Sequence, residues 1–205
     1  MKKILIVTVL LAVFLNVSYS QYDKYSLFEA VSKKYKDVKS VSFSFFSVES
    51  SIKGSVKATM NNKYLLSMPD RTIVCDGTSV WNYSKEEKKV VISSYESGGS
   101  SFSIDKFFFS FLMGYRPVNY LKENSSAKGS GYVLELEPID KASQAMQITK
   151  LKLWVDNNLN IRKVQIFTPQ SPQTWDISNL QINPTINKKT FIFTTPKDCE
   201  VIDLR

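Results

Sequence analysis

The sequence has no histidine, and it contains two cysteines among its 205 residues. Without histidine, the chain lacks the commonest general base and the commonest metal ligand of proteins. Two cysteines are too few for a structural zinc site, and neither a G-x-S-x-G string nor a glycine-rich phosphate loop is present. We therefore expect no cofactor, no metal site and no catalytic residue, so the protein is not expected to be an enzyme.

Acidic side chains give no sign of a catalytic pair. Glu86 and Glu87 lie among lysines in a charged stretch, and Glu135 and Glu137 alternate with apolar residues on one face of a predicted strand. Solvated charges are the ordinary role of carboxylates in such positions. We expect all four to face water.

Long apolar runs are missing after the N-terminal segment. Ile4–Val17 is apolar except for Thr8 and Asn16, but it is shorter than the ~20 residues that a membrane-spanning helix needs. Lys2 and Lys3 precede this run, and the small residues Ser18 and Ser20 suit cleavage before Gln21. We predict a secretory signal peptide over residues 1–20 and one exported, soluble domain over residues 21–205. Since no cysteine follows the cleavage site directly, no lipid anchor is expected.

Positive charge is spread along the chain, which has 27 lysines and arginines against 19 aspartates and glutamates. No arginine-rich block is present, so the charge does not indicate nucleic-acid binding. It is compatible with attraction to anionic membrane surfaces, and equally with a simple role in solubility.

The two cysteines leave an alternative open. Cys75 and Cys199 could form one disulfide in an oxidising compartment, or they could remain separate thiols. Pairing needs Cα atoms within about 7 Å of each other, and the sequence does not show whether these two residues meet.

The apolar residues change their period early in the chain. Leu27, Val31, Tyr35 and Val38 repeat at helical spacing and predict an amphipathic helix over residues 23–38. Beyond it, apolar residues alternate with polar ones, which is typical of half-buried β-strands. Turn residues such as Asn61-Asn62 and Asp76-Gly77 separate these segments. About eleven strands are predicted, at 41–45, 52–60, 64–68, 71–75, 80–83, 89–93, 132–137, 146–155, 161–168, 173–181 and 190–193, with residues 122–131 as a polar connection.

A phenylalanine-rich segment, Ser101–Tyr115, predicts a second helix among these strands. Its apolar stripe consists of Ile104, Phe107, Phe108, Phe111 and Leu112. Two helices are too few to cover eleven strands by flat packing, so we expect one mainly β, α+β fold: an unclosed antiparallel β-barrel whose concave apolar face is covered by helices. A two-sheet sandwich is the alternative. The second helix could be a permanent core plug or a lid over a site for apolar ligands.

Three stretches resemble the periplasmic outer-membrane lipoprotein carrier family, LolA. They are Asn62–Asp70, the D-G-x-x-x-W-x-Y hairpin within Ile73–Tyr83, and the closing stretch Thr190–Lys197. The resemblance implies an unclosed barrel of eleven strands with a helical lid, whose cavity holds the acyl chains of lipoproteins in transit. It also implies three partners for a monomeric carrier: acylated lipoproteins, an inner-membrane lipoprotein-releasing ABC transporter, and an outer-membrane acceptor or the membrane surface.

One departure from the family concerns the lid. Many members have an Arg-Pro pair after the second strand, and that arginine is linked to lid closure. Asn61-Asn62-Lys63 stands in this region here. We therefore assign no lid-latching arginine in this chain.

On this interpretation the strand residues of the apolar face line the lipid-binding cavity. They are Phe43, Phe45, Val56, Ala58, Leu66, Trp81, Leu134, Leu136, Leu151, Leu153, Val164, Ile166 and Ile177. The underside of the lid is predicted to consist of Leu27, Val31, Phe107, Phe108, Phe111 and Leu112. Ordinary core packing is the alternative for each of them. Alternative functions are a lipid- or lipoprotein-sensing regulatory protein of the same fold, an esterase with an unrecognised centre, and a structural surface protein.

Overall fold

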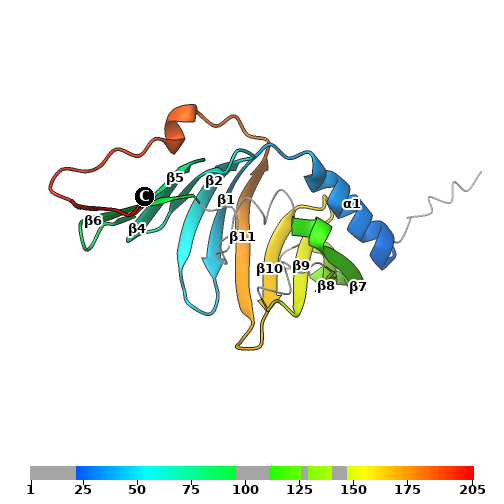
Figure 1. Cartoon of the computed structure of the whole chain (residues 1–205). Helices are drawn as coiled ribbons and strands as arrows, with labels where there is room; N and C mark the ends of the chain where they lie inside the picture. The colour runs from blue at the N-terminus through cyan, green and yellow to red at the C-terminus, as the bar shows by residue number, and fades with distance from the viewer. Residues whose placement is uncertain (1–21, 96–110, 126–128, 140–146) are drawn as a thin grey trace, which may run out of the picture.

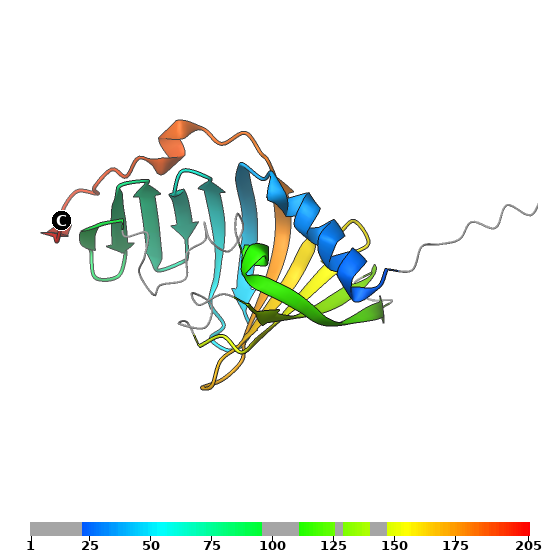
Figure 2. The same cartoon turned by 45° about the vertical axis from the view of Figure 1, so that its right-hand side comes forward.

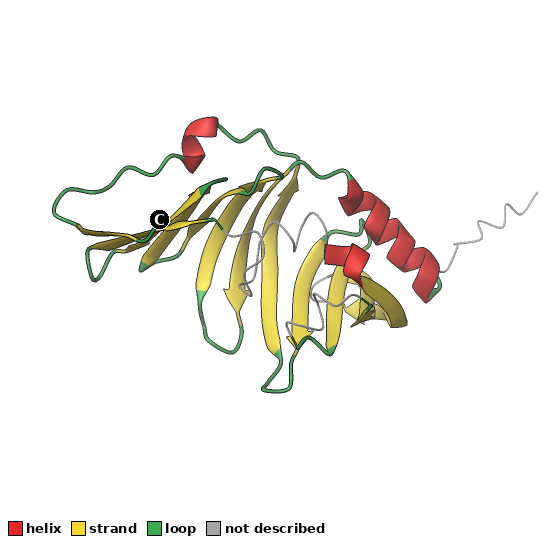
Figure 3. Cartoon of the chain, in the orientation of Figure 1, coloured by secondary structure: helices red, strands yellow, loops and turns green. Residues whose placement is uncertain are grey.

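The chain folds into one large, curved sheet of twelve strands with a single long helix on one side (Figures 1 and 3). The computed structural model describes residues 22–95, 111–125, 129–139 and 147–205. The helices and strands are α1 (Lys24–Lys36), β1 (Ser40–Ser47), β2 (Lys53–Thr59), β3 (Lys63–Ser67), β4 (Arg71–Asp76), β5 (Ser79–Ser84), β6 (Lys89–Ser94), η2 (Phe111–Gly114), β7 (Tyr115–Ser125), β8 (Gly129–Pro138), β9 (Lys150–Asp156), β10 (Ile161–Phe167), β11 (Gln173–Ile182), η3 (Lys188–Phe191) and β12 (Glu200–Asp203).

Helix α1 confirms the helix predicted at the N-terminal end of the domain. Asp23 caps it, since its carboxylate accepts hydrogen bonds from the backbone N–H groups of Tyr25 and Ser26, both at 2.8 Å. Ser26 completes a capping box by accepting a hydrogen bond from the Asp23 N–H. The buried side chains of α1 are Leu27, Val31 and Tyr35, one helical stripe. No helix within the described residues is long and apolar enough to cross a membrane.

The strands are arranged in the order β12-β6-β5-β4-β3-β2-β1-β11-β10-β9-β8-β7. Every neighbouring pair in this described sheet is antiparallel except β12 and β6. Strand β11 returns from the C-terminal half to pair with β1, so the two groups of strands form one sheet. The single-sheet prediction is confirmed over the two-sheet alternative, with twelve strands in place of eleven.

Two strands were not predicted from the sequence. Strand β7 covers part of the segment predicted as a polar connection, and Pro117 lies in it beside a β-bulge. Proline and a bulge are tolerated there because β7 is the last strand of the sheet. Strand β12 is four residues long and pairs with the opposite edge. By contrast, the strand predicted over residues 190–193 is wrong, since residues 188–191 form the 3-10 helix η3.

The face of the sheet on which α1 lies is called the inner face here. The sheet curves around α1, which packs against β7 and β8 (Figure 2). The main hydrophobic core lies between them. It consists of Leu27, Val31, Tyr35, Val38, Val41, Phe43, Val56, Ala58, Tyr115, Leu134, Leu136, Leu151, Leu153, Val155, Ile161, Val164 and Ile177.

The outer face has a small core of its own over β3 to β6. The C-terminal segment after β11 crosses this face, and its helix η3 contacts β3 and β4. Phe191 is buried there, and Phe193 stacks on Trp81 with ring centroids 6.3 Å apart. Val74, Val90 and Ile92 are buried on the same strands, in cross-strand register with Trp81 and Tyr83. The two halves of the sheet are therefore covered on opposite faces.

Tyr35 ties the end of α1 to the β9–β10 turn. Its hydroxyl oxygen accepts a hydrogen bond from the buried Ile161 N–H at 3.0 Å. Burial raises the pKa of Tyr35 to about 12. Lys34 adds a second link, because its ammonium donates to the side-chain oxygen of Asn160 at 2.7 Å.

Replacing Tyr35 with phenylalanine should destabilise the protein by about 1–3 kcal/mol, because the ring remains while the buried Ile161 N–H loses its acceptor. Urea unfolding of the variant measures this loss. Tyr25, which is 64% exposed on the same helix, is the control, and Tyr25→Phe should leave the free energy of unfolding unchanged. Equal stability of the two variants would contradict the role given to the hydroxyl.

The cysteines are not joined by a disulfide. Cys75 lies on β4, whereas Cys199 precedes β12 at the edge of the sheet, and β5 and β6 lie between these strands. The register aligns Glu200 with Lys89, Ser84 and Arg71. Cys199, one residue before Glu200, is therefore also about five residues from Cys75 along the strand direction. Three strand spacings of about 4.8 Å already exceed the separation that a disulfide spans. The separate-thiol alternative is the one that the structure has.

Candidate functional site

A mainly apolar row of side chains crosses the inner face of the sheet. Cross-strand register aligns Phe43 of β1 with Val56 of β2, Leu66 of β3 and Ile73 of β4. The same row continues through Asn82 of β5 to Val91 of β6. Period-two alternation places all these side chains on the side of α1. The row therefore leads from the core under α1 onto the β3–β6 half of the sheet.

Burial changes along this surface. Under α1 the side chains are fully enclosed: Leu134 and Leu153 are 0% exposed, and Val164 is 1% exposed. Beyond β2 the apolar side chains of the inner face are half-buried, apart from the fully buried Cys75 on β4. We define the half-buried apolar face as Phe45, Leu66, Ile73, Val80, Val91 and Trp175. Part of the apolar surface of these residues remains accessible to solvent, whereas the apolar side chains under α1 on the same face are packed.

Gly54 shapes one part of the half-buried apolar face. It pairs with Phe45 across β1 and β2, and a Cβ added to Gly54 would lie 2.6 Å from the Phe45 ring. The glycine thus lets the ring lie flat over β2. The ring also meets Trp175 edge to face, with centroids 5.7 Å apart. Phe45 and Trp175 thus form an aromatic pair at the boundary between the packed part and the less covered part of the inner face.

Polar side chains also lie on this side of the sheet, since Arg71, Asn82 and Ser93 share the face of Ile73, Val80 and Val91. Tyr64 lies next to Leu66 in the alternation and pairs with Cys75, which is 0% exposed. Burial raises the pKa of Tyr64 to about 12, and the nearby Cys75 and Tyr95 side chains add to the shift. Tyr64 is therefore a neutral phenol, suited to the edge of an apolar surface.

The structure places the predicted cavity residues in three groups. The largest group is buried in the main core: Phe43, Val56, Ala58, Leu134, Leu136, Leu151, Leu153, Val164 and Ile177. Phe45, Leu66 and Ile166 are half-buried and pack against that core. Trp81 is a correction, because it pairs with Val74 and stacks on Phe193 on the outer face.

The predicted lid residues also divide. Leu27 and Val31 of α1 are both 0% exposed and belong to the main core. Leu112 is half-buried in the 3-10 helix η2 and packs against the same core. Phe111 begins η2, and Tyr115, predicted as helical, begins strand β7. Phe107 and Phe108, with most of the predicted second helix, lie outside the described residues.

Ile73, Val80, Val91 and Trp175 belong to the half-buried apolar face but were not predicted. Strands β4 to β6 have apolar residues at successive positions, such as Ile73-Val74 and Val90-Val91. Alternation cannot distinguish the faces of such strands, since both are apolar. Register to β3, where Leu66 has a known face, is the information that places them.

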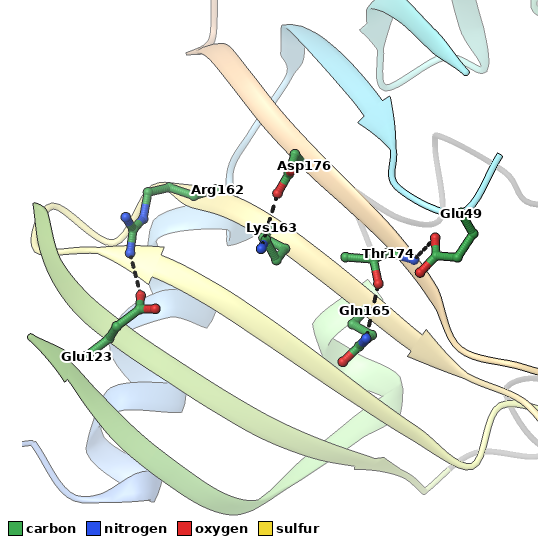
Figure 4. Close-up of polar contacts among 7 residues, drawn as sticks. All are labelled: Glu49, Glu123, Arg162, Lys163, Gln165, Thr174 and Asp176. Atoms are coloured by element: carbon green, nitrogen blue, oxygen red, sulfur yellow. Dashed lines mark hydrogen bonds and ion pairs between the residues drawn. The ribbon is translucent and has the colours of Figure 1, made fainter. Parts of the chain in front are cut away.

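The outer face of the β7–β11 half is polar and bears paired charges (Figure 4). Arg162 reaches Glu123 at 3.1 Å, and Lys163 reaches Asp176 at 3.4 Å. Gln165 donates a hydrogen bond to Thr174, whose backbone N–H donates to the Glu49 carboxylate at 2.7 Å. The Lys163–Asp176 and Gln165–Thr174 contacts join the neighbouring strands β10 and β11, whereas Arg162 and Glu123 join β10 to β7 across the two strands between them. These contacts keep this face hydrophilic.

Two of the four carboxylates predicted to face water form ion pairs, and Glu135, one of these two, is half-buried. Glu135 pairs with Lys152 at 2.7 Å, and this hydrogen bond lowers the pKa of the carboxyl below its ordinary value. Glu137 pairs with Arg116 at 3.1 Å. Glu86 and Glu87 are exposed in the β5–β6 turn. Within the described ranges, no three His, Cys, Asp or Glu side chains come together as a metal site would require.

Comparisons with known proteins agree with this architecture. The model of the family described as outer membrane lipoprotein carrier protein LolA matches residues 66–194. Comparison with curated proteins gave no match. Among solved structures, an uncharacterized conserved protein from Thermus thermophilus aligns with a TM-score of 0.56 at 10% identity, covering 88% of this chain and 99% of that one.

Two mycobacterial structures are also similar. LprF from Mycobacterium bovis has a TM-score of 0.49 at 10% identity, with 86% of this chain and 97% of that one covered. The lipoprotein LppX from Mycobacterium tuberculosis has a TM-score of 0.47 at 14% identity, with 80% and 95% covered. The likeness to the Thermus protein shows a shared fold. Because the LolA family model matches more than half of the sequence, the chain belongs to the outer membrane lipoprotein carrier protein LolA family.

Proposed function

We propose that this protein is a periplasmic carrier that shelters the acyl chains of lipoproteins and moves them from the inner to the outer membrane. Family membership supports this role. The main structural support is that burial decreases along the inner face: the apolar side chains under α1 are fully enclosed, whereas Leu66, Ile73 and Val91 are half-buried. An inner-membrane ABC transporter would supply the cargo, and an outer-membrane acceptor or the membrane itself would receive it.

The geometry suits reversible binding. An acyl chain gains about 0.8 kcal/mol for each CH₂ removed from water, so a shelter for several chains needs a large apolar surface. Here α1 and the main core already fill one half of the inner face, and the half-buried apolar face offers contact without a closed cavity of its own. Partial self-coverage of this kind lowers the net affinity and so favours hand-off to an acceptor.

Adjacent leucines on β3 give a matched test. Leu65 and Leu66 are both half-buried, but Leu66 pairs with Val56 on the inner face, whereas Leu65 pairs with Lys57 on the outer face. Leu66→Ser should weaken the binding of a fluorescent triacylated lipopeptide by roughly five- to thirtyfold, because about 1–2 kcal/mol of apolar contact is lost. The measurement is an equilibrium titration in solution, without membranes.

Leu65→Ser is the control for general destabilisation. Both variants remove the same side chain from the same strand, so thermal unfolding should show similar losses of stability. Lipopeptide affinity should change only in Leu66→Ser. Equal affinities of the two variants would overturn the assignment of the acyl-binding face.

A transfer assay separates a carrier from a lipid sensor of the same fold. Inner-membrane vesicles containing the lipoprotein-releasing transporter are mixed with the purified protein and with outer-membrane vesicles. A carrier is expected to deliver lipoprotein to the acceptor vesicles over several turnovers. Binding of lipopeptide without any delivery would indicate the sensor, and turnover of acyl esters would indicate an esterase.

A further inference from the structure

Six lysines gather at one end of the sheet. They are Lys36, Lys39, Lys57, Lys63, Lys188 and Lys189, and all are exposed. They come from four segments: the last turn of α1 with the chain that follows it, β2, β3 and η3. Figure 1 shows η3 along the same end of the sheet at which the chain passes from α1 into β1. This group is called the lysine patch here.

Direct contacts hold the four segments together. The Lys39 N–H donates a hydrogen bond to the Asn183 side chain at 2.7 Å, and the Lys39 carbonyl accepts one from Met60 at 3.1 Å. The Ser40 hydroxyl donates to the Pro184 carbonyl at 2.7 Å, just before η3, and η3 in turn contacts β3. The lysine patch is therefore a continuous surface built from segments far apart in the sequence.

The charge of the patch is poorly balanced. None of the six lysines forms an ion pair with another residue in the part of the chain that the structure describes, whereas Lys89, Lys152 and Lys163 elsewhere do. Two carboxylates lie close by, Asp37 and Asp76. The Asp76 carboxylate is aligned with Lys63 across β3 and β4, so the two carboxylates together offset two of the six positive charges. The surface keeps a strong net positive charge.

Exposed apolar side chains stand beside these lysines. Met60, in the β2–β3 turn, is 51% exposed, and Ile192, directly after η3, is 66% exposed. Lysines around a few projecting apolar residues are the combination that binds the interface of an anionic bilayer. The ammonium groups meet the lipid headgroups, and the apolar tips enter the boundary with the acyl chains.

We propose that the lysine patch, with Met60 and Ile192, docks the protein on anionic phospholipid membranes. Its lysines on β2, β3 and η3 lie on the outer-face side, so docking through them leaves the half-buried apolar face unobstructed. Each exposed lysine near an anionic membrane adds to the attraction, and this contribution falls as salt screens the charges. Docking of this kind holds the carrier at a membrane for the time that hand-off of cargo needs.

Vesicle co-sedimentation tests the proposal on the protein purified after export. Vesicles of phosphatidylglycerol and phosphatidylethanolamine serve as the anionic membrane, and phosphatidylcholine vesicles as the neutral one. Lys188→Glu combined with Lys189→Glu should weaken binding to anionic vesicles by roughly tenfold or more. Wild-type binding should weaken as salt is raised and should be far weaker on neutral vesicles.

Lys53→Glu combined with Lys122→Glu is the charge-matched control. Both lysines are exposed and lie outside the patch, on β2 at its other end and on β7. The control should bind anionic vesicles within about twofold of wild type apart from the small effect of net charge. Equal losses in the two double variants, or wild-type binding that is the same on neutral vesicles, would overturn the proposal, as would the absence of vesicle binding.

Two further measurements separate this proposal from the proposed function. Thermal unfolding checks that the Lys188/Lys189 variant is folded, and Lys188→Ala with Lys189→Ala provides a milder change that should weaken vesicle binding less. Lipopeptide affinity in solution should equal that of wild type in the patch variants. Loss of vesicle binding with intact lipopeptide binding supports the docking surface, whereas the Leu66→Ser result decides the acyl-binding face independently.

Discussion

Replacing Leu27 with alanine is expected to lower the free energy of unfolding by about 2–5 kcal/mol. Leu27 is 0% exposed and lies between α1 and the sheet, in the same core as Val31 and Leu134. Its truncation leaves a cavity in a close-packed core, which the surrounding side chains and strands can fill only in part. Urea unfolding monitored by tryptophan fluorescence measures the loss.

The size of this loss decides whether α1 is part of the core or a separable lid. A helix that belongs to the core unfolds together with the sheet, so its truncation weakens the whole domain. Tyr25→Ala, at an exposed position on α1, is the control and should change stability by less than about 0.5 kcal/mol. A loss below about 1 kcal/mol for Leu27→Ala, or separate transitions of helix and sheet, would contradict the core role.

Gly131→Ala is expected to lower the free energy of unfolding by about 3 kcal/mol. An added Cβ would lie 2.2 Å from the Val155 carbonyl oxygen and 2.7 Å from the Arg162 guanidinium. Gly131 is aligned with Glu123 on one side and Asp156 on the other. Because Gly131 has no side chain, the Arg162 side chain can pass over β9 and β8 and reach Glu123. Alanine must therefore displace backbone as well as the ion pair.

A double substitution separates these two causes. With Arg162 replaced by alanine, the side-chain clash is removed, but the clash with the Val155 carbonyl remains. Gly131→Ala should then still cost most of its original free energy, as measured by a double-mutant cycle in urea. A cost that vanishes in the Arg162→Ala background would show that the glycine serves the arginine alone. Ser130→Ala, at the exposed neighbouring position, should be nearly neutral.

Several elements were predictable because their signals are local. The stripe Leu27, Val31 and Tyr35 indicated α1, since helical spacing by itself aligns those side chains. The turns at Asn61-Asn62 and Asp76-Gly77 were predictable from residues that tolerate positive φ, and Asn62 and Gly77 indeed have φ of 56° and 102°. Alternation identified most strands, and strings such as Ile73–Tyr83 pointed to the family.

The edges of the sheet were not predictable in this way. Strand β7 has Pro117 and a polar end, and β12 is short and far from its partner β6 in the sequence. Each becomes a strand through pairing with a neighbour, so its own residues need no strong preference. Residues 190–193 have a strand-like alternation but do not form a strand. Their alternation reflects the packing of Phe191 and Phe193 on the outer face.

Local sequence patterns were enough to establish the class of the fold, a mainly β protein with an amphipathic helix, because alternation and helical periodicity depend on neighbours a few residues apart. That the strands form one sheet was decided by the long-range pairing of β11 with β1. Which parts of the inner face are filled became clear from the folded chain alone. It has α1 over one half, the C-terminal segment on the opposite side of the other half, and Trp81 beneath Phe193. Whether a face is covered depends on segments more than a hundred residues away in the sequence, so local patterns cannot predict it. That coverage is what leaves Leu66 and Val91 half-buried and makes them the candidate acyl-binding residues.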